Sequence, residues 1–205
     1  MSDNKNIRIV VISVLLLLAI LYGVLRHSGR LPVLDGSPIT PSVTGRLYVH
    51  TNPAFELHYP EGFSVNERYV NQSLGGNKKI PGVAFFIATS TSEGTNLGPD
   101  TFVSVEWKEG KNCSLNQFID SPSSVHVTEN GISYEVASTT GVGAGNIYED
   151  TVYLHGCIAV RYFIHSANIH NYEPGAVREF DRGALISSFD YVRRSLNADA
   201  GGDLI

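Results

Sequence analysis

Imidazole and carboxylate side chains, the groups that bind zinc in proteins, gather in one short stretch of the chain. This stretch contains His155, His165, His170 and Glu173, and imidazole with carboxylate is a common zinc ligand set. His155 and His165 stand at opposite ends of a predicted strand, roughly 30 Å apart, so they cannot share one ion. His165, His170 and Glu173 therefore form a candidate metal site on a loop. The alternative, surface histidines on a tyrosine-bearing loop, is the more ordinary interpretation of this spacing.

Asp150 and Arg161 are a second candidate site, because a predicted hairpin places both on one face of a sheet. If His155-Gly156 is a two-residue turn, Asp150 lies directly opposite Arg161, and both faces of this hairpin are largely apolar. An unpaired charge in such a place is costly, so we expect a partly buried ion pair. The pair is either structural or lines a polar pocket, and Asp150 and Arg161 are the candidate binding residues.

The only two cysteines are Cys113 and Cys157, which are too few for a cysteine-based zinc cluster. This usage is typical of a single disulfide formed outside the cytosol. We predict a Cys113–Cys157 bond that joins a short helix to the sheet and places the folded domain on the extracytoplasmic side. The alternative is two buried free thiols in a cytosolic domain.

Other motifs for catalysis or cofactor binding are missing from the sequence. It contains no G-x-S-x-G or H-E-x-x-H motif. The glycine-rich stretch 141–146 lies between two predicted strands and precedes no helix that could bind phosphate, so we expect no cofactor. The chain has 15 basic and 20 acidic residues, a net charge of −5, and we expect no nucleic acid partner because basic surface is lacking.

The elements that must position these residues are mainly strands. Strand patterns cover Leu47–His50, Phe55–Tyr59, Val83–Thr89 and Thr101–Trp107, and two hairpins follow, one turning at Asn130-Gly131 and one at His155-Gly156. Ser114–Gln117 matches a capping box and predicts a short helix. Apolar residues at helical spacing between Val177 and Leu196 predict a C-terminal helix. We expect an α+β fold, a sandwich on an antiparallel sheet, over residues 46–197.

An uncharged apolar run, Ile9–Leu25, precedes this domain. As a helix it would be roughly 25 Å long at about 1.5 Å per residue, which nearly spans a bilayer. No Ala-x-Ala cleavage site follows it, so we predict an uncleaved single-pass transmembrane helix rather than a secretory signal or a buried core helix. Residues 1–8 are then cytoplasmic, residues 26–45 a flexible stalk and residues 198–205 a disordered tail. The lipid bilayer is the first expected partner.

One motif and the order of the elements resemble a known fold family. Phe55–Phe63 reads FELHYPEGF, a strand that ends in Tyr-Pro, and antiparallel strands and a closing amphipathic helix follow it. This is similar to PsbP/Mog1-type domains and to membrane-anchored bacterial proteins with the same opening. The resemblance implies a PsbP/Mog1-like sandwich and a non-catalytic adaptor or assembly role, and it transfers no site residue.

Three functions fit these features. The first is a membrane-tethered, extracytoplasmic, non-catalytic module that binds or assembles a membrane or envelope protein. The second is an extracytoplasmic metal-dependent hydrolase, which would use the histidine-rich stretch. The third is a structural envelope protein that self-associates through its membrane helix, Ile9–Leu25. The lack of a catalytic motif favours the first.

Overall fold

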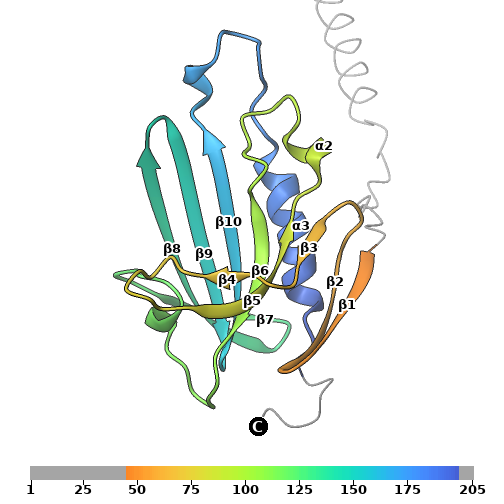
Figure 1. Cartoon of the computed structure of the whole chain (residues 1–205), viewed down its shortest axis with the longest axis vertical. Coiled ribbons are helices and arrows are strands. Elements are labelled where there is room, and N and C mark those ends of the chain that lie inside the picture. Colours follow the sequence, from red (N-terminus) through yellow and green to blue (C-terminus); the bar gives the residue numbers. More distant parts are fainter. Residues whose placement is uncertain (1–44, 199–205) are drawn as a thin grey trace, which may run out of the picture. The chain divides into compact units, whose positions relative to one another are not determined.

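The computed structural model describes residues 45–198, and its main element is one large antiparallel sheet (Figure 1). The strand order is β3-β5-β6-β10-β9-β8-β7, and β4 also pairs with β5. The bounds are β3 Ser64–Asn66, β4 Val70–Asn71, β5 Ile80–Phe86, β6 Phe102–Trp107, β7 Val125–Glu129, β8 Ile132–Gly143, β9 Asn146–His155 and β10 Ile158–Ala167. Strands β1 (Gly45–Thr51) and β2 (Ala54–Pro60) form a separate hairpin. The fold is therefore mostly antiparallel sheet with few helices, as expected for the α+β class.

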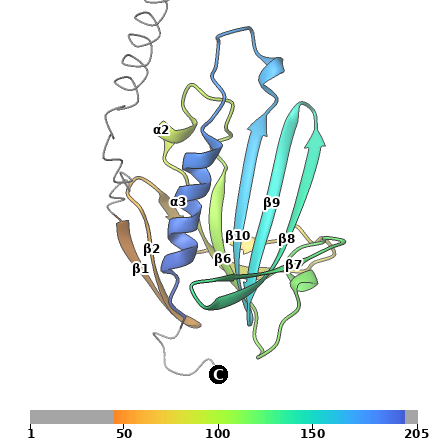
Figure 2. The same cartoon turned by 180° about the vertical axis from the view of Figure 1, so that it is seen from behind.

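One face of the sheet packs against helix α3 (Arg182–Ser195) and the β1–β2 hairpin (Figure 2). Leu185, Phe189 and Val192 form the buried stripe of α3, and they share a core with Phe55 and Leu57 of β2. The hydroxyl of Ser195 donates to the carbonyl of His58 and accepts from its amide, at 3.0 and 2.8 Å. These bonds attach the end of α3 to β2. We call this the helical face of the sheet.

Helix α3 begins later than its apolar spacing predicted. The helical pattern from Val177 is wrong at its start, because Asp181 is the N-cap and its carboxylate accepts from the Ala184 amide at 2.9 Å. Residues 176–180 instead form a loop, in which the Arg178 backbone bonds to Gly94 and Asn96. Gly183 lies inside the first turn and does not divide the helix.

The opposite face is covered only in part by described residues. The Ser114 amide donates to the Gln117 side chain at 3.1 Å, as the predicted capping box requires. The element that follows is a single 3₁₀ turn, η1 (Leu115–Gln117), and not the predicted short α-helix. Leu115, Phe118 and Ile119 pack on Val152, Leu154 and Ala159 of the sheet. Farther along the strands, no described segment lies in front of β9 and β10 (Figure 1). We call this the loop face, and its uncovered part the open end.

The first hairpin register was predicted correctly and the second was wrong by two residues. Asn130 and Gly131 both have positive φ and form the turn that pairs Val127 with Tyr134. In the second hairpin the turn is Gly156-Cys157, because Gly156 has φ +59° and His155 pairs with Ile158. Asp150 is therefore opposite Phe163, not opposite Arg161. A shift of two residues keeps every side chain on its face, so Asp150 and Arg161 are still diagonal neighbours.

The predicted bond between Cys113 and Cys157 is present, with a Cα–Cα distance of 4.9 Å. Cys157 lies in the β9–β10 turn and not on the sheet face beside Ala159, as the earlier register implied. The disulfide therefore ties the segment before η1 to the end of the central hairpin. Because η1 contributes the apolar cover of the loop face, the bond holds that cover in place.

The expected membrane helix, residues 9–25, lies outside the described residues, as do residues 1–8, the stalk up to residue 44 and residues 199–205. Gly45, expected to end the stalk, already belongs to β1. No helix within residues 45–198 is long and apolar enough to cross a membrane.

Reduction of the disulfide is predicted to lower the melting temperature of the full chain markedly. The bond closes a loop with a sequence separation of 44, for which the chain-entropy estimate is about 4 kcal/mol. Calorimetry with and without reductant measures the change. The control is the double variant Cys113→Ser/Cys157→Ser, whose melting temperature should be low and insensitive to reductant. An unchanged melting temperature on reduction would show that η1 is held by its apolar packing alone.

Candidate functional site

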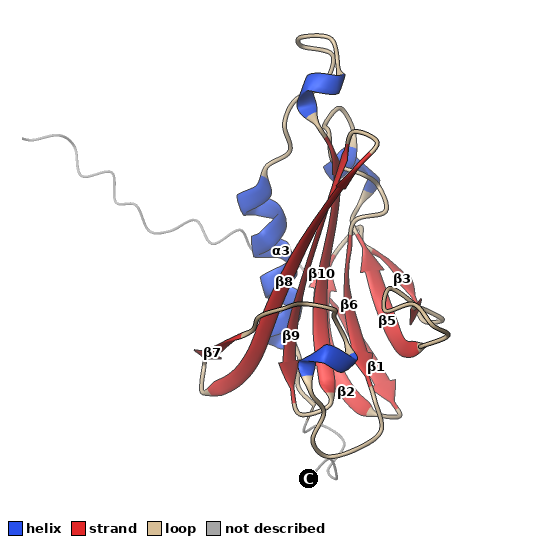
Figure 3. Ribbon diagram, turned by 90° about the vertical axis from the view of Figure 1, so that its left-hand side faces the viewer, coloured by secondary structure: helices blue, strands red, loops and turns tan. Residues whose placement is uncertain are grey.

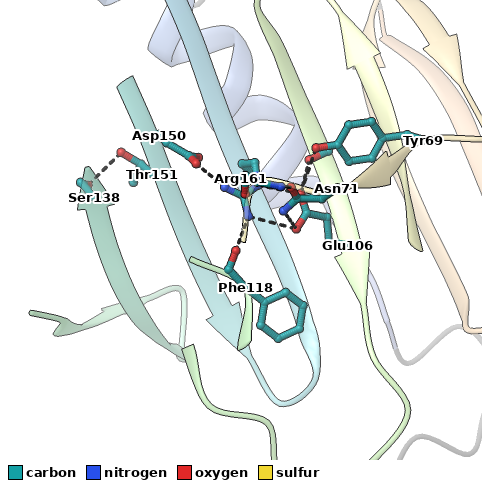
Figure 4. Close-up of polar contacts among 10 residues, drawn as sticks. Tyr69, Asn71, Glu106, Phe118, Ser138, Asp150, Thr151 and Arg161 are labelled. Carbon is teal, nitrogen blue, oxygen red and sulfur yellow. Dashed lines mark hydrogen bonds and ion pairs between the residues drawn. The ribbon is translucent and has the colours of Figure 1, made fainter. Parts of the chain in front are cut away.

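Arg161 lies in the middle of the loop face and is only 2% exposed. Its Nε donates to Glu106 Oε1 at 2.7 Å and its Nη2 to Glu106 Oε2 at 3.2 Å. Its Nη1 donates to Asp150, on the other side of the guanidinium (Figure 4), and its Nη2 also donates to the Phe118 carbonyl. Burial alone would lower the pKa of Arg161, but Glu106 and Asp150 raise it above its ordinary value. The guanidinium is therefore a fixed positive charge.

Glu106 is the better satisfied of the two carboxylates. It is fully buried, and besides Arg161 it accepts from the Tyr69 hydroxyl at 3.3 Å, the Asn71 amide at 3.1 Å and the Ser104 hydroxyl at 3.1 Å. Such a set of donors is what a buried carboxylate requires. Burial, and then the charge of Glu106, raise the pKa of Tyr69, so its hydroxyl keeps the proton that it donates.

A glycine makes room for this arrangement. A Cβ atom on Gly82 in β5 would lie 2.7 Å from the Val105 carbonyl oxygen and 3.0 Å from the Tyr69 ring. Any side chain at position 82 would therefore push Tyr69 away from Glu106.

Asp150 is the incompletely satisfied member. Its side chain is 18% exposed, yet its Oδ1 is buried and has no partner among the described residues. Burial raises the pKa of Asp150 above its ordinary value of 3.8, Arg161 opposes this and Glu106 adds to it. Ionisation of Asp150 thus costs folding free energy, and its contribution to stability is greater below its pKa than above it.

Three phenylalanines continue from Asp150 across the sheet toward β5. In strand register Phe86 is opposite Phe102, Phe102 opposite Phe163, and Phe163 opposite Asp150. Neighbouring ring centroids are 5.2 and 5.1 Å apart. Tyr148 lies beside this line, 6.3 Å from Phe163. We call Phe86, Phe102, Phe163 and Tyr148 the aromatic row. It lies along the open end, with Phe102 buried, Phe86 and Phe163 half-buried and Tyr148 exposed, and Asp150 is at its edge.

The predicted metal ligands are not brought together. His165 Nδ1 is 2.6 Å from Asp100 Oδ1, and its ring stacks on Tyr148 at 4.5 Å. His170 lies beyond the strand in the 3₁₀ turn η2 (Ile169–Asn171), and Glu173 follows it, both exposed. Within residues 45–198 no group of three or more His, Cys, Asp or Glu side chains is placed to hold a metal ion. Strand geometry explains this. His165 belongs to β10 and its ring packs on Tyr148 of the neighbouring strand, whereas His170 and Glu173 belong to the loop that follows β10.

The Asp150–Arg161 contact was predicted, but Glu106 and the aromatic row were not. The signal was available in the strand Thr101–Trp107, whose alternation puts Ser104 and Glu106 on the same face as Phe102. A polar pair on an apolar-flanked face requires a partner. Nothing in the sequence indicated that Tyr69 and Asn71 would contact Glu106. Both lie in the segment between β3 and β5, and only tertiary packing determines where that segment crosses the sheet.

Comparison with known proteins gives a likeness in structure but none in sequence. No protein-family model matches the chain, and no curated protein matches its sequence. The solution structure of cyanobacterial PsbP (CyanoP) from Synechocystis sp. PCC 6803 is similar with a TM-score of 0.41 and 13% identity, over 80% of this chain and 98% of that one.

Substitutions in the cluster are predicted to differ strongly in cost. Arg161→Met leaves two buried carboxylates without their cation and should cost about 3–5 kcal/mol of the free energy of unfolding. Asp150→Asn should cost far less, because Arg161 and Glu106 then form a neutral pair. Arg161→Met should also cost less in a Glu106→Gln background. Denaturant unfolding of the full chain measures all of these free energies.

The matched control is Arg182→Met, which removes an ion pair with Glu149 in which the arginine side chain is 53% exposed. Its cost should stay within about 1 kcal/mol. Equal costs for Arg161→Met and Arg182→Met would contradict the charge balance described here.

Proposed function

We propose that this chain is a membrane-tethered, extracytoplasmic, non-catalytic binding module, and that it binds a basic side chain of a membrane or envelope protein at the open end. The apolar run Ile9–Leu25 supports the tether. The Cys113–Cys157 disulfide supports the extracytoplasmic location, because such bonds are rare in the cytosol.

The observation that carries the proposed binding activity is the charge imbalance of the Arg161 cluster. One guanidinium serves two carboxylates, and Asp150 Oδ1 is buried without a partner. A buried polar atom in this condition costs free energy that a donor can recover. A guanidinium or ammonium group donates hydrogen bonds and also supplies the missing positive charge.

The aromatic row favours a cation with an apolar stem. Arginine and lysine side chains lay their methylene groups on apolar surface and their charge on aromatic faces. Phe163 is directly opposite Asp150, and Tyr148 lies beside both. A basic side chain lying along the row would therefore bring its charge to Asp150. The same surface gives metal ions or anions no comparable set of ligands.

A blocked arginine amide is predicted to bind the full chain in lipid nanodiscs and to shift the ring resonances of Phe163 and Tyr148 in NMR spectra. Asp150→Asn should weaken this binding roughly tenfold or more, since a hydrogen bond to a charged group contributes about 1.5–3 kcal/mol. Binding should also weaken as the pH falls through the pKa of Asp150, because the protonated carboxyl has no charge. Because burial raises the pKa of Asp150, this loss of binding should begin at a higher pH than it would for an aspartate with the ordinary pKa of 3.8.

Two controls test whether charge at this place is responsible. The citrulline analogue keeps the shape of arginine without its charge and should not bind. Glu93→Gln removes an exposed carboxylate elsewhere on the domain and should leave binding unchanged. Binding of citrulline as tight as that of arginine, or no effect of Asp150→Asn, would refute the cation site.

The tether is tested by fractionation. The mature protein is predicted to keep its N-terminus and to sediment with membranes after high-salt washing, since the apolar run is retained. N-terminal sequencing and mass spectrometry of the membrane fraction check both points. Soluble protein that begins near residue 26, or free thiols at Cys113 and Cys157 in protein from native membranes, would contradict the proposed location.

A further inference from the structure

The outer edge of β8 has a stretch with no neighbouring strand in the described part of the chain. Strand β8 extends to Gly143, but its partner β7 begins only at Val125, which pairs with Val136, so β7 covers no residue of β8 after Val136. Figure 3 shows β8 continuing well past β7. Residues 137–143 therefore form a free edge beside the open end, and we call them the β8 edge.

The hairpin geometry determines which backbone groups point outward from this edge. Ala144 and Gly145 have positive φ and form the turn between Gly143 and Asn146. A pair that closes such a turn is hydrogen-bonded, and bonded and non-bonded pairs then alternate along the strands. Ser138, Thr140 and Val142 accordingly direct their N–H and C=O groups away from β9, and these groups have no partner among the described residues.

The β8 edge has none of the features that protect exposed strand edges from pairing. Natural edges are blocked by charged residues, proline or bulges. No charged residue and no proline occurs between Val136 and Tyr148, and the β8–β9 ladder runs without interruption from Glu135 to Gly143. An edge of this kind accepts another strand.

We infer that the β8 edge pairs with the β8 edge of a second copy of this chain, in antiparallel orientation, so that two sheets join into one. A two-fold axis perpendicular to the sheet makes the contact isologous, and the outward groups of each copy meet those of the other. No like charges face each other in this arrangement, because both edges are uncharged.

Exposed apolar side chains indicate that the strand pairing with the β8 edge comes from a second copy of this chain and not from another protein. Val142 and Val125 are 79% and 61% exposed, the two highest fractions among the large exposed apolar residues of the described domain. They mark opposite ends of the β8 edge and lie on the same face of the sheet. Antiparallel pairing brings Val142 of each copy toward Val125 of the other, which buries both.

Joining the sheets would also place two open ends side by side. The axis keeps both loop faces on one side, with the two Asp150 residues three strand spacings apart, about 14 Å. A partner with two basic side chains could then bind both copies, with the gain in affinity that two linked contacts provide. This consequence rests on the proposed function, whereas the pairing itself does not.

The test is crosslinking of the full chain in liposomes with a short thiol-specific bis-maleimide. Thr140→Cys places a thiol near the proposed axis and should give several-fold more covalent dimer than Thr128→Cys. Thr128 is also exposed and also lies on an outer strand edge, that of β7, so it is the matched control. Adding Val142→Lys to the Thr140→Cys variant should remove the excess dimer, because two lysines then flank the pairing.

The Val142→Lys variant should keep the circular dichroism spectrum of the parent, since this side chain is exposed and its replacement leaves the fold of each copy intact. Equal dimer yields at positions 140 and 128, or a yield that Val142→Lys leaves unchanged, would overturn the inference. So would Thr140→Cys protein that crosslinks in native membranes only to a different protein. Binding of the arginine amide is measured separately, so either proposal can fail alone.

Discussion

A buried guanidinium in the middle of an antiparallel sheet is the constraint around which the loop face of this domain is built. Arg161 could not remain on an apolar face without anionic partners, because the cost of burying an unpaired charge exceeds what the neighbouring hydrophobic contacts provide. Glu106 on the adjacent strand supplies the first partner. The requirements of Glu106 then explain Ser104, Tyr69 and Asn71, and the requirement of Tyr69 for space explains Gly82.

The same constraint connects the disulfide to the cluster. The Phe118 carbonyl accepts from Arg161 only because η1 lies on the loop face. The segment before η1 is tied by Cys113 to the turn at the end of the central hairpin. A disulfide, apolar packing and a hydrogen bond from Arg161 thus all hold one short segment on the loop face. Beyond Phe118 this cover stops, which leaves Asp150 half-satisfied at the boundary between the covered and the open part of the sheet.

The sequence predicted the faces of the sheet more reliably than its registers. The Asn130-Gly131 turn was assigned correctly because both residues favour the positive φ that this turn needs. At His155-Gly156-Cys157, glycine takes the first turn position and not the second, and one glycine alone does not reveal which. Asp150 and Arg161 were still found as neighbours because the error was an even number of residues. Glu106, by contrast, comes from a strand distant in sequence, and only tertiary packing brings it to Arg161.

The shape of the open end bears on the kind of ligand it can take. Two of the larger hollows in the described domain lie elsewhere: one of about 310 Å³ borders the start of α3, and another of about 320 Å³ borders its end. Both are on the helical side of the sheet and neither is lined by Asp150. A small molecule on the open end would be buried on one side only, whereas small-ligand sites enclose most of the ligand surface. The proposed protein partner would bring its own surface to exclude water from the row, which would strengthen the contact between its basic side chain and Asp150. The combination of an unpaired buried acceptor with a partly exposed aromatic row is therefore an argument for the proposed protein partner rather than for a metabolite.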